Sequence, residues 1–165
     1  MLKKILLKIT MLTLFVCFLA SCASTGKPEK IKNDPSVDKV IFESEDPEGF
    51  KLTTSITEWP SLKFGSVDLE GYKYLNIELY SPNCVDGYIS IDSWGEEKMV
   101  AQFIGPVPAE PILFQALIND NTLSFICIAS GLFDGDIRVE GVDCYIKKVW
   151  ATNTKAEFNG NDYAN

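Results

Sequence analysis

Aromatic, amide and carboxylate side chains alternate with aliphatic ones over residues 72–94. The polar positions are Tyr74, Asn76, Glu78 and Tyr80 before a turn, and Tyr88, Asp92 and Trp94 after it. In a strand every second side chain points to the same face, so each segment presents these groups together. Flat rings stack on the apolar C–H faces of sugars, and planar amides and carboxylates hydrogen-bond vicinal hydroxyls. The pattern therefore predicts a glycan-binding face, with stacking by Tyr74, Tyr88 and Trp94 and hydrogen bonds from Asn76, Glu78, Asp92 and Gln102.

Two other interpretations of this face stay open. Tyr and Trp favour strands, and cross-strand aromatic pairs stabilise a sheet by about 0.2–1 kcal/mol each, so the face could be plain surface. It could also be the contact of a structural or assembly protein with an envelope partner. Trp59, beside Pro60 in a loop, is a further candidate for recognition, or else it closes one end of the fold.

The two halves of this stretch are expected to form one hairpin. Leu75, Ile77 and Leu79 form the aliphatic side of the first segment, and Ile89 and Ile91 that of the second. Between them lie Pro, Asn, Asp and Gly residues, which are typical of turns. The hairpin would bury its aliphatic side and expose the mixed side. Gln102 and Gln115 would add amides if their strands join the same sheet.

The rest of the chain predicts further short strands and no long helix. Apolar or alternating segments recur at 40–42, 50–56, 62–69, 98–104, 112–118, 123–129, 136–140 and 143–152. The segment 123–129 is apolar on both faces, which is typical of a central strand. Nine or ten strands separated by turn residues every 8 to 12 positions predict an all-β fold, an antiparallel β-sandwich or a barrel.

Several of these segments resemble a galactose-binding-like jelly roll. They read Val-Ile-Phe-Glu-Ser from Val40, Gly-Tyr-Lys-Tyr-Leu-Asn-Ile-Glu-Leu from Gly71, Gly-Tyr-Ile-Ser-Ile from Gly87 and Val-Asp-Cys-Tyr-Ile-Lys-Lys-Val from Val142. This is the sandwich of many non-catalytic carbohydrate-binding modules, and the resemblance covers 39–153. It implies a structural calcium joining the first and last strands, with Glu43, Glu45 and Asp143 as ligands. A solvated acidic turn is the alternative for these carboxylates.

The N-terminal segment is predicted to be a targeting signal. Lys3, Lys4 and Lys8 precede an apolar run that is too short to span a bilayer comfortably. The following Leu19-Ala20-Ser21-Cys22 looks like the lipobox of bacterial lipoproteins, which implies a lipid on Cys22 and a domain held at a membrane outside the cytoplasm. An ordinary secretory peptide is the alternative. The expected organisation is a signal peptide at 1–21, a flexible tether at 22–38, the sandwich at 39–154 and a disordered tail at 155–165.

Charge and residue types narrow the classes of function. The net charge of −8 becomes −11 once the three signal lysines are removed, so nucleic acid is not an expected partner. The chain contains no histidine, which excludes His-dependent triads and Cys/His zinc sites. No phosphate loop or nucleophile motif occurs, so we expect a binding protein and no enzyme. Past Cys22 three cysteines remain, Cys84, Cys127 and Cys144, which leaves the disulfide state open, although Cys127 in its apolar run is expected to be buried.

Overall fold

The structure is a computed structural model that describes residues 33–83, 87–132 and 135–160. These residues contain ten β-strands and no α-helix. The described residues from Asn33 onward form one compact unit. The strands are β1 (Lys39–Glu43), β2 (Phe50–Thr53), β3 (Ser61–Asp68), β4 (Tyr74–Tyr80), β5 (Gly87–Trp94), β6 (Met99–Gly105), β7 (Ile112–Leu117), β8 (Thr122–Leu132), β9 (Gly135–Arg138) and β10 (Asp143–Thr152).

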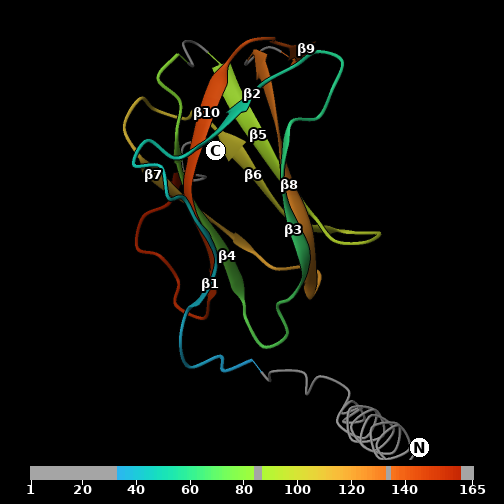
Figure 1. Ribbon diagram of the computed structural model, residues 1–165, viewed down its shortest axis with the longest axis vertical. Coiled ribbons are helices and arrows are strands. Elements are labelled where there is room, and N and C mark those ends of the chain that lie inside the picture. Colours follow the sequence, from blue (N-terminus) through green and yellow to red (C-terminus); the bar gives the residue numbers. More distant parts are fainter. Residues whose placement is uncertain (1–32, 84–86, 133–134, 161–165) are drawn as a thin grey trace, which may run out of the picture. The chain divides into compact units, whose positions relative to one another are not determined.

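The strands form two antiparallel sheets that face each other (Figure 1). In sheet A the order is β1-β10-β4-β7, with β2 also pairing with β10. In sheet B the order is β3-β8-β5-β6, with β9 also pairing with β8. The predicted antiparallel β-sandwich of jelly-roll type is confirmed, as is the central position of the 123–129 segment, which lies in β8 between β3 and β5.

The predicted hairpin of 72–94 is wrong. β4 pairs with β10 and β7 in sheet A, whereas β5 pairs with β8 and β6 in sheet B. The connection between them therefore crosses from one sheet to the other. A period of two identifies a half-buried strand but says nothing about its partner, because any strand of a sandwich has one inner and one outer face. The two polar faces consequently lie on opposite sides of the molecule.

The aliphatic sides of both strands do enter the core, as expected. Leu75, Ile77 and Leu79 of β4 and Ile89 and Ile91 of β5 are all fully buried. They pack in one cluster with buried residues from both sheets. The core is therefore the layer between the sheets, and burial of one such side chain contributes about 1.5–3 kcal/mol.

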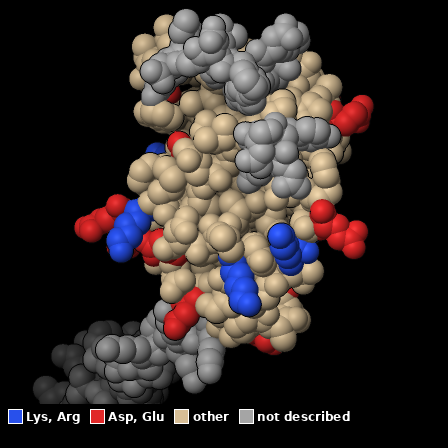
Figure 2. Space-filling view, turned by 180° about the vertical axis from the view of Figure 1, so that it is seen from behind, with Lys and Arg blue, Asp and Glu red and all other residues tan. Residues whose placement is uncertain are grey.

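The edge formed by β6 and β7 carries no charged side chain. From behind, the described surface shows an uncharged area in the middle of the molecule, with acidic side chains mainly at the sides and Lys or Arg side chains below it (Figure 2). Charged residues usually protect an edge strand from pairing with other chains. Here the chain after β10 covers part of this edge, since a Cβ on Gly160 would lie only 2.6 Å from Cε1 of Phe114 in β7.

The segment after β10 is held by side-chain hydrogen bonds. Gln115 Nε2 donates to the carbonyl oxygen of Thr154 at 3.0 Å, and the Ala156 amide donates to Gln115 Oε1 at 2.8 Å. The sequence predicted a disordered tail from Lys155; residues 155–160 instead lie within the described chain, and 161–165 lie outside it. The polar composition of this segment by itself indicates disorder. The side chains that contact it, Gln115 and Phe114, belong to a distant strand, so the segment's own sequence gives no sign of them.

Candidate functional site

The structure divides the eight predicted binding residues between the two sheets. Tyr74, Asn76 and Glu78 lie on β4 in sheet A, and Asp92 and Trp94 lie on β5 in sheet B. The remaining three are Gln102 on β6, Trp59 in the loop between β2 and β3, and Tyr88 on β5, whose side chain lies outside the described residues. One continuous surface cannot contain all of them.

Asn76 is not available to a ligand in this structure, because its side chain is only 3% exposed. Its Oδ1 accepts a hydrogen bond from Gln115 Nε2 at 2.9 Å, and Gln115 in turn holds the chain after β10. Both amides were expected on an open face. They instead form a buried polar pair, which satisfies groups that would otherwise be costly to bury.

The outer face of sheet A presents aromatic rings that contact lysines of the same chain. The rings of Tyr80 and Tyr145 stack at a centroid distance of 5.0 Å. Lys147 Nζ lies 5.8 Å from the Tyr80 centroid, and Lys51 Nζ lies 5.9 Å from that of Tyr145. A ring already in contact with a lysine and another ring offers less face for a sugar. Sheet A is therefore the weaker candidate.

The outer face of sheet B contains an aromatic pocket of about 340 Å³. Its lining residues are Trp59, Asp92, Trp94, Phe125 and Cys127. Register explains the grouping: Asp92 of β5 lies opposite Cys127 of β8, and Trp94 lies opposite Phe125. Alternate residues of a strand share a face, so both pairs lie on the same side of the sheet. The first pair places the Asp92 carboxylate beside the Cys127 thiol, and the second places the Trp94 indole beside the Phe125 ring. The strands thus form the floor of a pocket that the sequence predicted only in part.

Trp59 reaches this pocket from a loop that is tied down at both ends. At its start, Thr54 Oγ1 donates to the carbonyl of Val139 at 2.7 Å and accepts from the amide of Val142 at 3.0 Å. At its end, the Ile128 amide donates to the carbonyl of Pro60 at 3.0 Å, which ties the loop to β8. The Trp59 side chain is 50% exposed. The loop therefore holds an accessible indole beside the sheet.

Asp92 is the carboxylate of the pocket, and neighbouring strands orient it. Gln102 Nε2 donates to Asp92 Oδ1 at 3.0 Å, and Ser90 Oγ donates to the same oxygen at 3.3 Å. Gln102 lies opposite Asp92 in the pairing of β5 with β6. Two donors on one oxygen restrict rotation of the carboxylate and leave Oδ2 for other partners. The predicted amide and acid therefore act as one polar group.

Cys127 lines the pocket, and its thiol is unreactive because it is buried and protonated. It is 4% exposed, and its thiol donates to the backbone carbonyl of Asp92 at 3.5 Å. Burial, together with the nearby Asp92 carboxylate, raises the pKa of this thiol to about 11. At neutral pH it stays protonated, as expected for a small buried apolar residue. Cys144 is also buried but lies in sheet A, and Cys84 lies outside the described residues.

Sequence reasoning missed Phe125 and Cys127 as site residues. Their segment was interpreted as a central strand, and it is one. A strand that is apolar on both faces is usually covered on both sides, but the outer face of β8 is covered only in part. The signal that could have found these residues is the apolar outer side of β8, because apolar side chains on an outer face can line a binding pocket.

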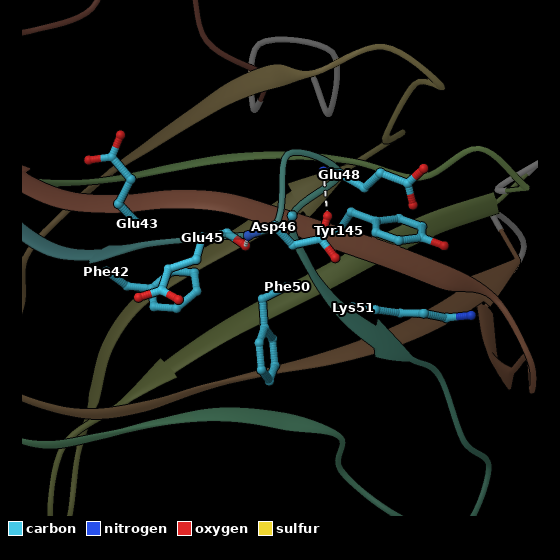
Figure 3. A pocket seen from close by; sticks show the side chains of 10 residues that line it. Phe42, Glu43, Glu45, Asp46, Glu48, Phe50, Lys51 and Tyr145 are labelled. Carbon is cyan, nitrogen blue, oxygen red and sulfur yellow. Dashed lines mark hydrogen bonds between the residues drawn. The ribbon is translucent and has the colours of Figure 1, made fainter.

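A second hollow, of about 590 Å³, lies beside the acidic loop between β1 and β2 (Figure 3). Phe42 and Glu45 lie on one side of it, Tyr145 with Glu48 on the other, and Phe50 between them. Among the residues that the structure describes, no three carboxylates or thiols lie close enough together to hold a metal ion.

None of the three predicted calcium ligands lies in a cluster of carboxylates. Asp143 Oδ2 pairs with Lys51 Nζ at 2.8 Å, and Glu43 pairs with Lys148 Nζ at 3.3 Å. Glu45 is exposed on the loop. The structure therefore does not assemble the site from Glu43, Glu45 and Asp143, because lysines from neighbouring strands already neutralise two of the three carboxylates.

The Asp143–Lys51 pair predicts a pH dependence of stability. Hydrogen bonds from Lys51 and then Thr53 hold the pKa of Asp143 below its ordinary value. A carboxyl group whose pKa is lower in the folded chain than in the unfolded chain stabilises the fold above the unfolded value, about 3.9, and this contribution is lost as pH falls through the lowered pKa. Asp143→Asn should therefore lower the free energy of unfolding at pH 7, and the difference should vanish near pH 2. Urea unfolding of both proteins at the two pH values measures this, and an equal difference at both would contradict it.

Comparisons with known proteins give distant structural likenesses. No protein-family model and no curated protein match the sequence. Two variants of a family 29 carbohydrate-binding module are similar in structure at 12% and 13% sequence identity, each with a TM-score of 0.43; they cover 76% and 75% of this chain and 95% and 98% of their own. A chain of infectious bursal disease virus matches at 12% identity with a TM-score of 0.34, over 81% of this chain and 39% of its own. These sequence identities and TM-scores are too low to assign the chain to a family.

The N-terminal predictions fall on residues outside the described part of the chain, including Cys22 and the tether up to Lys32. Within the described part, no helix has the length and hydropathy that crossing a membrane requires.

Proposed function

We propose that this chain is a non-catalytic binding module that captures a glycan in the pocket of sheet B. The observation that supports this most is the grouping of two indoles and a phenyl ring around one oriented carboxylate. Trp59, Trp94 and Phe125 supply the rings, and Asp92 supplies the polar group. A concave, mostly apolar site with few but well-placed polar groups is the usual form of a small-molecule site.

The aromatic walls would bind the apolar face of a sugar ring. Trp94 and Phe125 lie on adjacent strands, and Trp59 stands beside them on its loop. A sugar between these rings would bury its C–H groups against carbon while its edge hydroxyls stay near polar groups. Strands provide a rigid floor, which lowers the entropy lost on binding.

The polar contacts would come from Asp92 and Gln102. Asp92 Oδ2 would accept a hydrogen bond from one hydroxyl, and the Gln102 side-chain oxygen would accept one from a second hydroxyl, while Gln102 Nε2 donates to Asp92 Oδ1. Hydrogen bonds to a charged acceptor contribute more than neutral ones, about 1.5–3 kcal/mol. Tyr74, Asn76 and Glu78 have no part in this proposal, because they lie on the other sheet.

We further propose that the module is attached to a membrane of the cell envelope through a lipid on Cys22. The support is the sequence Leu19-Ala20-Ser21-Cys22 after an apolar run with preceding lysines. Cys22→Ser should release the chain from the membrane fraction into the soluble one. Retention of the variant in the membrane fraction would rule the lipid anchor out.

The glycan proposal is tested by tryptophan fluorescence of the full-length protein in detergent, titrated with a panel of soluble glycans. Binding should shift or quench the emission, and the double variant Trp59→Phe/Trp94→Phe should remove most of the change. Trp150→Phe is the matched control, since Trp150 lies on β10 in sheet A and should leave the response intact. A panel without any response, together with an envelope protein that co-purifies through this domain, would favour the docking alternative and overturn the glycan proposal.

A further inference from the structure

Asp92 is the one charged residue among the described residues that line the sheet B pocket. The other lining groups are three aromatic rings and a buried, protonated thiol, none of which carries charge at neutral pH. Lys63 of β3 lies opposite Phe125 and is exposed. Among the described lining residues, the only charge is therefore the negative charge of Asp92.

The carboxylate cannot easily turn away from a ligand. Two donors from β5 and β6 hold its Oδ1, and no donor among the described residues reaches its Oδ2. Charges interact more strongly beside low-dielectric aromatic walls than in bulk water. A second carboxylate or a sulfate in this pocket would thus meet a fixed negative charge that neither rotation nor solvent fully relieves.

The volume of the pocket is compatible with a small ligand unit. About 340 Å³ lies at the small end of the range for ligand pockets, roughly 300–1,000 Å³. That space accommodates one pyranose ring beside the three aromatic side chains.

We infer that the pocket takes a single neutral or amino-sugar unit of a glycan and rejects uronic acids and sulfated sugars, with Asp92 as the specificity-determining residue. This inference rests on the proposed glycan function and adds its selectivity. A hydroxymethyl group at C6 can donate to Asp92 Oδ2, whereas a carboxylate at C6 has no proton to donate and adds like charge. An amino group would form a charge-assisted hydrogen bond with the same oxygen.

The test uses matched sugar pairs that differ only at C6. Methyl glucoside and methyl glucuronide, and the corresponding galacto and manno pairs, are titrated into the full-length protein in detergent and followed by NMR or calorimetry. The wild type should bind the neutral member of the best pair about tenfold more tightly than the uronic member. Asp92→Asn keeps the size of the side chain and should reduce this preference to about twofold, mainly by improved binding of the uronide.

Two controls separate selectivity from other effects. Glu78→Gln removes the same charge from the outer face of sheet A and should leave the preference at about tenfold. In the wild type, 0.5 M NaCl should weaken the preference through screening, which gives a second readout if Asp92→Asn does not fold. Equal binding of both members by the wild type, or an undiminished preference in Asp92→Asn, would overturn the selectivity while the glycan function stands. Absence of binding to every member of every pair would overturn the glycan function itself.

Discussion

Loss of both Trp59 and Trp94 to alanine is expected to lower glycan affinity about 100-fold, which corresponds to about 2.7 kcal/mol. Both indoles line the same pocket, one from a loop and one from β5. Aromatic residues at the centre of a binding site commonly carry most of its binding energy. Each single variant should lose about tenfold, measured by calorimetry with the best glycan of the panel.

The fold should be intact in these variants, because both side chains lie on the outer surface. Far-UV circular dichroism and the urea midpoint should be close to those of the wild type. Trp150→Ala provides the matched control on sheet A and should change affinity by less than about twofold. An equal loss of affinity in Trp150→Ala would place the binding surface on sheet A and refute the pocket of sheet B.

Truncation after Asn153 is expected to lower the free energy of unfolding by about 2–3 kcal/mol. The missing segment supplies the Thr154 carbonyl and the Ala156 amide, which bond to both ends of the Gln115 amide, and Gly160, which packs on Phe114. The Gln115 amide keeps its bond to Asn76 but loses these two hydrogen bonds, and a lost hydrogen bond of a buried group costs about 1–3 kcal/mol. Exposure of the ring adds about 25 cal/mol per Å² of apolar surface. Urea unfolding at neutral pH measures the difference.

A chain that ends at Gly160 is the control for this truncation, since it retains every contact named above and should match the full chain. Gln115→Ala should reproduce about half of the loss, and Gln102→Ala, the exposed glutamine of β6, should change stability by less than about 0.5 kcal/mol. The truncated chain would also leave the uncharged β6–β7 edge less covered, so light scattering should report a greater tendency to associate. Equal stability of the chains ending at 153 and 160 would show that the segment contributes nothing.

Strand positions were predictable because they depend on local pattern. The last strand was placed at 143–152, and β10 has those bounds. The predicted segments 40–42, 98–104 and 112–118 end within one residue of the bounds of β1, β6 and β7. Alternation also identified which side of β4 and β5 is buried, since one face of a sandwich strand must be apolar.

Most of the candidate site was predictable from residue type. Asp92, Trp94, Gln102 and Trp59 carry the residue types that sugar recognition requires, and they do lie around one pocket. Phe125 and Cys127 were missed because their contribution depends on which strand pairs with β5. That pairing joins residues more than 30 positions apart, and nothing in either segment specifies it.

By itself, therefore, the sequence determined an acidic, all-β chain, the approximate places of its strands, and the inner and outer sides of β4 and β5. It also supplied most of the groups available for recognition. Only the tertiary structure decided that β4 and β5 belong to different sheets, that Asn76 and Gln115 are covered, and that the aromatic pocket lies over β5 and β8. The physical reason is that alternation is a property of one strand, whereas partner choice minimises the free energy of the whole core. The polar face of 72–94 was thus two faces, and of these sheet B has the open aromatic pocket.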